Sequence, residues 1–452
     1  MPDRKLTFMA ASLLIVGLVV QACGAAATTA PSAAPTPTPA AGSAEPSPAP
    51  TLAPATLTLW HNYGKEANAT ATEALVKAFE AKYPGINIEV VSQPADNYFD
   101  LLTAAAISKT GPDLTTMWTG LFDLKNQAYL QPLNDLVALD ELKKLKGIEY
   151  SSLNFNPDDG VLVVPLEVQF YNGFYNKELF KNAGLDPDKF PTTWDELFAA
   201  CQKLKDAGIT PFVYGSGGQA LGASFYAWYD FSYLMMIYSP ADWKNLYTGT
   251  TPWTDPAIKA QIDKWVSLFT KGYTNQDVLT NTESDAQFLA GEAAMTMEGT
   301  WSIAGFQDKL GDNVGAFVPP FSDTPIKGIV EYSGDGFAMT TYSQHKPQAA
   351  AFLAFLASDE AQKIVADSGL IPAKEGFSTD SRMATDLLSY AADKGYARYP
   401  MIDNVIQGEV VDAGNQVLNA AFGGAMSVDD ALKNMQDTLT QLPADRRGDT
   451  YK

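Results

Sequence analysis

The chain has 452 residues, 46% of them hydrophobic, which is enough for two or three domains with buried cores. Its formal net charge of -21 makes nucleic acid and anionic membrane surfaces unfavourable partners, because both repel an acidic protein. We therefore expect a soluble globular protein that binds no nucleic acid.

The first 22 residues have the pattern of a bacterial lipoprotein signal peptide. Two basic residues precede an apolar run at 6–20 that is too short to span a bilayer comfortably, and Ala22 stands directly before Cys23. We expect cleavage before Cys23 and attachment of a lipid to it. This predicts an extracytoplasmic protein that is held to the cell membrane by its lipid anchor only. A plain secretory signal with a chance cysteine is the alternative.

Residues 23–54 are predicted to form a tether. After Cys23 the composition is almost entirely Ala, Pro, Thr, Ser and Gly. Such a segment cannot bury enough apolar surface to fold, and its prolines favour the extended polyproline conformation. At about 3.1 Å per residue in that conformation, it would hold a folded domain well away from a membrane.

If Cys23 carries lipid, no disulfide is available, and the histidines are too few for a metal cluster. Only Cys23 and Cys201 occur, and Cys201 lies in a helical pattern where it is predicted to be a small buried hydrophobe. His61 and His345 are the only histidines and stand far apart in the sequence. The sequence therefore predicts no metal ion, no cofactor and no catalytic residue.

From residue 55 onward the pattern alternates strands and helices. Strands are predicted at 56–60, 86–91 and 113–118, and helices at 69–83 and 98–108. Such units build a parallel sheet with helices on both faces, which indicates an α/β fold.

The second half of the chain is predicted to be mainly helical. A short buried strand is expected at 293–297, after Gly291 as a left-handed stop. Alternation within 161–175 predicts a strand with Glu167, Gln169 and Tyr171 on one face. Helices are predicted at 195–207, 256–270, 284–289, 346–368, 405–421 and 428–442.

Three tryptophans stand just beyond the ends of predicted strands. The first strand ends in Trp60, His61, Asn62 and Tyr63, the third ends in Trp118, and the strand at 293–297 is followed by Trp301. Open α/β sheets bind ligands beyond the carboxyl ends of their strands, and an indole face suits the apolar face of a sugar ring. The alternative is that each tryptophan is a core or rim aromatic. Trp253, in a predicted loop, could also reach such a cleft.

Eight stretches resemble, in family order, the extracellular solute-binding proteins of the maltose and glycerol-3-phosphate type, the capture subunits of ABC importers. The resemblance implies a monomeric receptor that delivers its ligand to ABC permease subunits. It also implies a two-lobed, periplasmic-binding-protein-like (type II) fold, in which each lobe is a sheet flanked by helices and a multi-crossover hinge joins them. The stretches are LTLWHNYG, KAFEAKYPGINIEVV, GPDLTTMW, YLQPLNDL, PLEVQFYNGFYNKELF, PTTWDEL, FLAGEAAMTMEGTW and SVDDALKNMQDTL.

The resemblance implies how the chain is divided between the lobes. The first lobe is expected to contain 55–134 and 330–372. The second is expected to contain 135–329 and 373–452.

Several site residues follow from the resemblance. The family often places a ligand-contacting polar residue six positions before the Tyr of its YNK motif, which is Gln169 here. The motif YSGDGFAMT resembles the family's glycine-rich return to the first lobe and makes Gly334 and Asp335 candidates. Lys65 and Arg398 are further candidates. The alternatives are a sheet-surface role for Gln169, a tight turn without ligand at Gly334, and solvated surface positions for Lys65 and Arg398.

The ligand is predicted to be a neutral sugar or oligosaccharide. Only five arginines occur, and none stands near a motif up to Gly336, whereas phosphate and carboxylate ligands usually need a guanidinium or a basic cluster. We expect capture by hinge closure, with a sugar docked on one lobe and covered by the other.

Two other functions stay open from the sequence. A secreted glycoside hydrolase would need two carboxylates across a sugar, and Glu167, Asp335, Glu298 and Asp123 are available, although their spacing pairs none of them. A surface carbohydrate-binding protein without transport is the second alternative.

Overall fold

A computed structural model describes residues 52–64, 67–94, 97–216 and 225–447. Contacts divide the chain into residues 1–51 and 52–452. The predicted signal peptide, Cys23, most of the tether and Lys65 therefore lie outside the described residues.

The first sheet joins strands that are far apart in the sequence. Its order is β2-β1-β3-β10-β4, in which β1, β2 and β3 are parallel, as predicted. β10 runs antiparallel to both β3 and β4. The strands are β1 Ala55–His61, β2 Ile86–Ser92, β3 Leu114–Trp118, β4 Val163–Pro165 and β10 Asp335–Met339.

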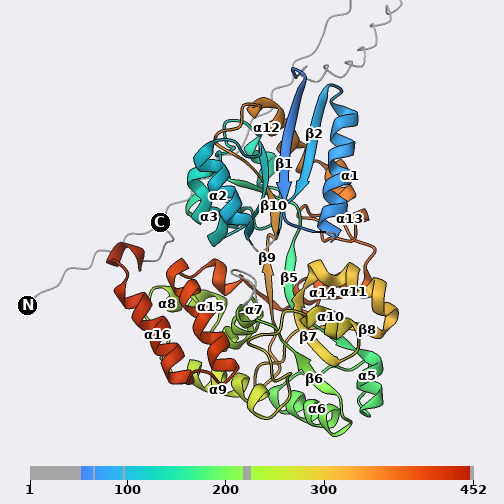
Figure 1. The fold of residues 1–452 in the computed structure, drawn as a ribbon, viewed down its shortest axis with the longest axis vertical. Helices are drawn as coiled ribbons and strands as arrows, with labels where there is room; N and C mark the ends of the chain where they lie inside the picture. The colour runs from blue at the N-terminus through green and yellow to red at the C-terminus, as the bar shows by residue number, and fades with distance from the viewer. Residues whose placement is uncertain (1–51, 65–66, 95–96, 217–224, 448–452) are drawn as a thin grey trace, which may run out of the picture. The chain divides into compact units, whose positions relative to one another are not determined.

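Helices from both ends of the folded region pack on this sheet. Apolar side chains of α1, α12 and α13 form one cluster with Leu57 and Leu59 of β1, and α2 packs on the other face with Met117 of β3. Figure 1 shows α13 beside α1. The helices are α1 Ala67–Lys82, α2 Tyr98–Ser108, α3 Leu121–Asn126, α4 Leu139–Leu142, α12 Lys346–Leu356 and α13 Asp359–Asp367.

The stretch 346–368, predicted as one helix, forms two. α12 ends at Leu356 and α13 begins at Asp359, because Ser358 takes an extended backbone conformation. The Ser358 hydroxyl accepts a hydrogen bond of 3.2 Å from the Ala361 N–H and so caps the second helix. The prediction of a continuous helix was wrong.

The second sheet has the order β11-β9-β5-β7-β6. The first half of β5 pairs with β9 and its second half pairs with β8, so both strands share one edge of β5. The predicted strand at 293–297 is confirmed within β7, and Gly291 before it has a φ of 75°. The strands are β5 Gln169–Asn176, β6 Thr210–Val213, β7 Ala293–Gly299, β8 Val314–Phe317, β9 Gly328–Tyr332 and β11 Ala397–Tyr399.

The helices that accompany the second sheet contribute most of a large aromatic core. Those predicted at 256–270 and 284–289 are confirmed with the same bounds. They are α5 Lys177–Asn182, α6 Trp194–Asp206, α7 Phe225–Leu234, α8 Lys244–Tyr247, α9 Pro256–Thr270, α10 Ser284–Leu289, α11 Ile303–Leu310, α14 Arg382–Ala392, α15 Gly408–Phe422 and α16 Val428–Gln441.

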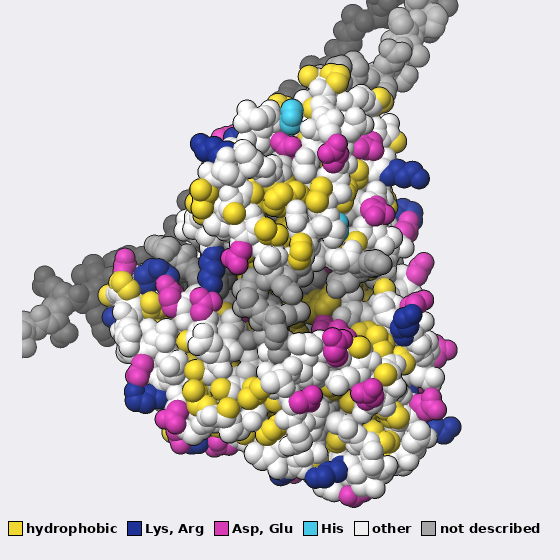
Figure 2. Space-filling model, in the orientation of Figure 1, with side chains coloured by type: hydrophobic (Ala, Val, Ile, Leu, Met, Phe, Trp, Pro, Cys, Tyr) yellow, Lys and Arg dark blue, Asp and Glu magenta, His cyan; other side chains and the backbone are white. Residues whose placement is uncertain are grey.

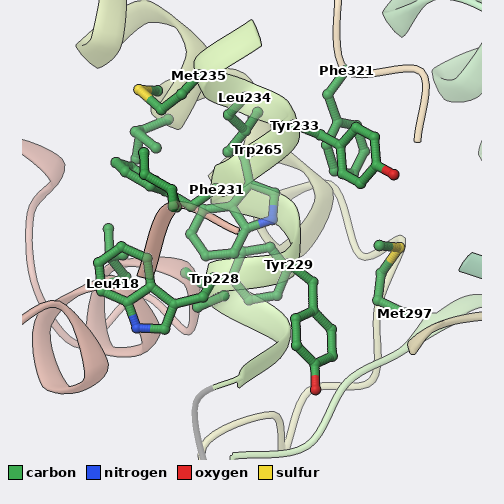
Figure 3. Packing of buried hydrophobic residues seen from close by; sticks show 14 of the residues in the cluster. Trp228, Tyr229, Phe231, Tyr233, Leu234, Met235, Trp265, Met297, Phe321 and Leu418 are labelled. Atoms are coloured by element: carbon green, nitrogen blue, oxygen red, sulfur yellow. The ribbon is translucent and has the colours of Figure 1, made fainter. Parts of the chain in front are cut away.

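Aromatic side chains of α7 point to different parts of this core. Figure 3 shows Trp228 beside Leu418 and Tyr229 on the side of Met297. Trp253 is 0% exposed and its ring centroid lies 5.8 Å from that of Phe231. The expectation that Trp253 could reach a cleft was wrong, because its large apolar side chain is buried in the core.

Three short connections between the sheets lie side by side. The Leu166 N–H donates to the Asp335 carbonyl at 2.9 Å, and the Val168 N–H donates to the Ile371 carbonyl at 2.8 Å. Glu167 also forms a bridge with Pro372. The segments 166–168, 333–335 and 371–373 thus hold one another by backbone hydrogen bonds.

The division of the chain between the sheets differs from the expected one at the first connection. The segment 135–165, expected in the second lobe, supplies β4 to the first sheet and packs Val137 and Leu142 into its core with α12. Residues 330–332, expected in the first lobe, end β9 in the second sheet. The apolar side chains of the short turns after residue 134 are buried against the first sheet, and composition does not predict this.

Candidate functional site

Glu167 lies at the first connection and is tied to both sides of it. Its carboxylate accepts a hydrogen bond of 2.5 Å from the Asn68 amide of α1 and one of 2.8 Å from the Gln169 amide of β5. Glu167 and Gln169 are 1% and 3% exposed, so both polar side chains are buried. The strand predicted through 161–175 is divided into β4 and β5, and Glu167 lies between them. It nevertheless contacts Gln169, as the shared face predicted.

The second connection packs directly against these residues. Gly334 has a φ of +70°, and a Cβ added there would lie 2.8 Å from the Glu167 carbonyl oxygen and 3.0 Å from Gln169 Cγ. Glycine is required because it tolerates both the left-handed backbone and the close approach. Asp335 follows, and its carboxylate accepts a hydrogen bond of 3.3 Å from the Tyr332 hydroxyl.

The residues that follow β1 are buried beside the same connection. The hydroxyls of Tyr63 and Thr116 lie 2.6 Å apart, and the rings of His61 and Tyr63 stack at 5.4 Å. Burial raises the pKa of Tyr63, and the charges of Asp335 and Glu167 raise it further. Burial also lowers the pKa of His61. Asn62 is buried as well, and its side-chain oxygen has no hydrogen-bond partner among the described residues.

Four aromatic rings form what we call the aromatic cluster: Tyr171, Tyr229, Trp301 and Tyr332. The Tyr171 ring centroid lies 4.0 Å from that of Tyr229, 5.9 Å from that of Trp301 and 6.4 Å from that of Tyr332. Trp301 also contacts Tyr229 edge-on at 5.8 Å. Its indole folds back over Gly299, where an added Cβ would come within 2.0 Å of the ring.

Tyr229 and Tyr332 were missed as site residues. Tyr229 stands in the dense aromatic run of α7, and its neighbour Trp228 faces the core instead. Tyr332 begins the YSGDG motif, two residues before Gly334, so the motif itself was the signal that could have found it.

Trp60 and Trp118 belong to a different cluster from Trp301. Both pack at the edge of the apolar group around α2, where the Trp118 ring lies 5.0 Å from that of Phe99 and 4.8 Å from that of Phe122. Trp301 packs at the edge of the large core of the second sheet. A single groove lined by all three indoles stays a prediction.

Carboxylates surround the aromatic cluster. Burial raises the pKa of Tyr171, Tyr229 and Tyr332, and in each case the charged group with the next largest effect is a carboxylate: Asp403 for Tyr171, Glu298 for Tyr229 and Asp335 for Tyr332. Acidic side chains are also spread over the face of the molecule drawn in Figure 2.

Asp403 was not predicted as a site residue. It lies on the 3₁₀ turn η10 (Ile402–Asn404), which packs against α7 and α3. Burial raises its pKa to about 7. Asp123 of α3 is also fully buried, and burial raises its pKa. The short C-terminal turn carries no sequence signal that would separate Asp403 from a surface acid.

Arg398 lines a pocket of 230 Å³ that also includes Tyr332 of the aromatic cluster and Val168 of the first connection. Parts of the segments 146–150, 331–333 and 398–400 line this pocket. Arg398 donates a hydrogen bond of 2.9 Å to Glu331. Burial raises the pKa of Glu331, although the charge of Arg398 acts the other way. Arg398 is thus engaged with a carboxylate of its own sheet.

The described residues contain no group of three or more His, Cys, Asp or Glu side chains that could hold a metal ion. Among the buried carboxylates, Glu167 and Asp335 lie at the connections, and the charge of Asp403 acts on the aromatic cluster. The arrangement offers hydrogen-bond acceptors and ring faces to a ligand.

The family model for bacterial extracellular solute-binding proteins matches residues 63–363, which include most strands of both sheets and the first two connections between them. The chain belongs to this solute-binding protein family. The expected two-lobed α/β fold is confirmed by two sheets flanked by helices and by the solved structures that resemble it.

Relatives of this solute-binding protein include binding proteins from different microorganisms. An uncharacterized ABC transporter extracellular-binding protein of Pyrococcus horikoshii is 28% identical over 372 residues, covering 79% of this chain and 77% of the relative. The sn-glycerol-3-phosphate-binding periplasmic protein of Shigella dysenteriae is 26% identical over 331 residues, covering 68% and 72%. These relatives are binding proteins rather than enzymes.

Solved structures confirm the fold of this solute-binding protein. A chitin oligosaccharide binding protein has a TM-score of 0.72 at 24% identity, covering 86% of this chain and 98% of that one. A solute-binding protein in complex with raffinose has a TM-score of 0.68 at 19% identity, covering 85% and 98%. Within the part of the chain that the structure describes, no helix is long and apolar enough to cross a membrane.

Proposed function

We propose that this chain is the extracytoplasmic receptor of an ABC importer and that it captures a sugar or oligosaccharide. The observation that carries the proposal is the aromatic cluster, in which Trp301 packs edge-on to Tyr171 and Tyr229 beside the buried amide of Gln169. Ring faces suit the apolar faces of sugars, and amide and carboxylate oxygens suit their hydroxyls. Solved relatives with this fold bind chitin oligosaccharide and raffinose.

The proposed mechanism is capture by closure about the three connections between the sheets. Tyr63 and Asn68 approach them from the first sheet, and Gln169 and Tyr171 approach from the second. A ligand held between these groups would stabilise the closed arrangement through contacts that the open one lacks. The closed receptor would then deliver its sugar to the permease subunits. We propose that Cys23 carries the lipid that anchors it and that the receptor acts as a monomer.

A phosphorylated ligand is the specific alternative that the glycerol-3-phosphate relative suggests. The carboxylates around the aromatic cluster make a phosphorylated ligand unfavourable, because they would repel an anion. The candidate Arg398 pairs with Glu331 instead. The electrostatics of the site therefore support a sugar without an anionic group.

A thermal-shift screen of the full chain tests this proposal. Sugars, oligosaccharides and glycerol 3-phosphate are compared at equal concentrations, and binding is then measured by calorimetry. We expect stabilisation by sugars and none by the phosphate. Stabilisation by phosphorylated ligands alone would refute the proposal, and turnover of an oligosaccharide would favour the glycoside hydrolase alternative.

A further inference from the structure

Two neighbouring acceptor side chains on η10 lack hydrogen-bond donors within the part of the chain that the structure describes. Asp403 and Asn404 are 2% and 4% exposed, and Oδ1 of each has no hydrogen-bond partner among the described residues. Buried acceptors of this kind are costly unless a donor reaches them. For Asp403, whose charge acts on the aromatic cluster, a ligand bound at that cluster would supply the donor.

The position of Asp403 links its missing hydrogen-bond donor to the aromatic cluster. Its turn packs against α7, which carries Tyr229, and the charge of Asp403 raises the pKa of both Tyr171 and Tyr229. Its carboxylate therefore lies within electrostatic reach of two rings that also contact Trp301.

The surroundings add negative charge and supply little positive charge. The charged groups with the largest effects on the cluster tyrosines are all carboxylates. Two cations, Lys146 and Arg398, line the pocket that includes Tyr332, and Arg398 is paired with Glu331. The internal segments outside the described residues carry one lysine, Lys65, and two acids, Glu66 and Asp96. A buried carboxylate is stabilised best by a donor that is also positively charged.

We propose that the ligand is an amino sugar, whose protonated amine is held by Asp403 beside the ring faces of Tyr171, Tyr229 and Trp301. An ammonium group donates to the carboxylate and is attracted by the faces of tryptophan and tyrosine, whereas a hydroxyl offers only the hydrogen bond. This inference rests on the proposed function and narrows its ligand from sugars without an anionic group to sugars that carry a positive charge.

Calorimetry on the full chain tests the proposal with matched ligands. Each set contains an amino sugar, its N-acetyl form and the parent sugar: glucosamine with N-acetylglucosamine and glucose, the galactose and mannose counterparts, and the β-1,4-linked disaccharides of glucosamine, N-acetylglucosamine and glucose. In at least one set we expect the amine to bind roughly tenfold or more tightly than both neutral members, the scale of a hydrogen bond to a charged group. Neutral members that bind as tightly or more tightly overturn this proposal and leave the proposed function standing. Binding of none of these sugars counts against both.

Variants of the chain identify the residues that produce the preference for the amine. Asp403→Asn keeps the shape of the side chain and removes its charge, so the preference for the amine should collapse while the affinity for the neutral member changes less. Asp367→Asn removes one exposed charge from α13 and should keep the preference. Tyr229→Phe should keep it and Tyr229→Leu should reduce it, which tests the ring independently if the Asp403 variant folds poorly. A preference unchanged in both Asp403→Asn and Tyr229→Leu would overturn the assignment.

Discussion

Asn68 donates a hydrogen bond of 2.5 Å from its side-chain amide to the carboxylate of Glu167, 99 residues further along the chain. Asn68 stands in the first turn of α1 on the first sheet, and Glu167 stands in the connection that leads to the second. The contact therefore fixes a buried carboxylate at the point where the two sheets are joined.

Replacement of Asn68 should destabilise the protein. Asn68→Ala leaves Glu167 buried with one donor fewer, which should cost about 1–3 kcal/mol of the free energy of unfolding. Asn68→Asp should cost more, because it sets two carboxylates against each other. Urea denaturation measures both, and Asn87→Ala, at an exposed asparagine of β2, is the control. A loss no larger than that of the control would contradict the role given to this hydrogen bond.

Trp301 is predicted to contribute a stacking surface to the ligand. Trp301→Ala should weaken sugar binding by about 1–3 kcal/mol, on the scale of stacked aromatic contacts. Trp301→Phe keeps a ring over Gly299 and should lose less. Isothermal titration calorimetry with the sugar found in the screen gives both values. Equal affinity of wild type and Trp301→Ala would remove the residue from the site.

Alanine substitutions at Gly334 and Gly184 separate the cost of backbone strain from the cost of close contact. Both have a φ of +70°, but an added Cβ at Gly184 meets no atom within 4 Å, whereas at Gly334 it meets Glu167 at 2.8 Å. Gly184→Ala should cost roughly 1–2 kcal/mol for the left-handed backbone alone. Gly334→Ala should cost more and should also weaken ligand binding, because it displaces Glu167 and Gln169. Equal thermal stability of the two variants would show that the contact at Gly334 relaxes freely.

Asp230 should make the protein less stable as the pH rises. Its carboxylate accepts hydrogen bonds from the Tyr214 hydroxyl at 2.9 Å and the Trp265 indole at 2.6 Å, and burial raises its pKa to about 8. Because the folded state binds the proton more tightly than the unfolded state, this contribution is complete below the unfolded pKa of about 4. It is lost as the pH rises toward 8, by at most about 1.4 kcal/mol per pH unit.

Asp230→Asn should flatten this dependence, because an amide does not titrate. Chemical denaturation at pH 5 and pH 8.5 compares the slopes of wild type and variant. Asp263→Asn, at an exposed position of α9, is the control for loss of one carboxylate. If wild type and Asp230→Asn lose the same stability between these two pH values, Asp230 is charged in the folded protein.

The sequence alone was sufficient for the local elements and the family. The helices at 98–108 and 256–270 follow from apolar residues at helical spacing, and the strand of β7 follows from a short apolar run after Gly291. These signals are local, because periodicity and turn residues act within a few positions. The break at Ser358 was missed, since the apolar pattern continues through it and only the cap ends the helix.

The tertiary structure decided which residues meet. It assigned 135–165 to the first sheet, buried Trp253 in the core and set Trp118 apart from Trp301. It also brought Tyr229, Tyr332 and Asp403 to the candidate site. Each of these outcomes depends on which distant surface covers a side chain. Burial and charge then follow from neighbours far away in the chain, and no pattern of adjacent residues records them.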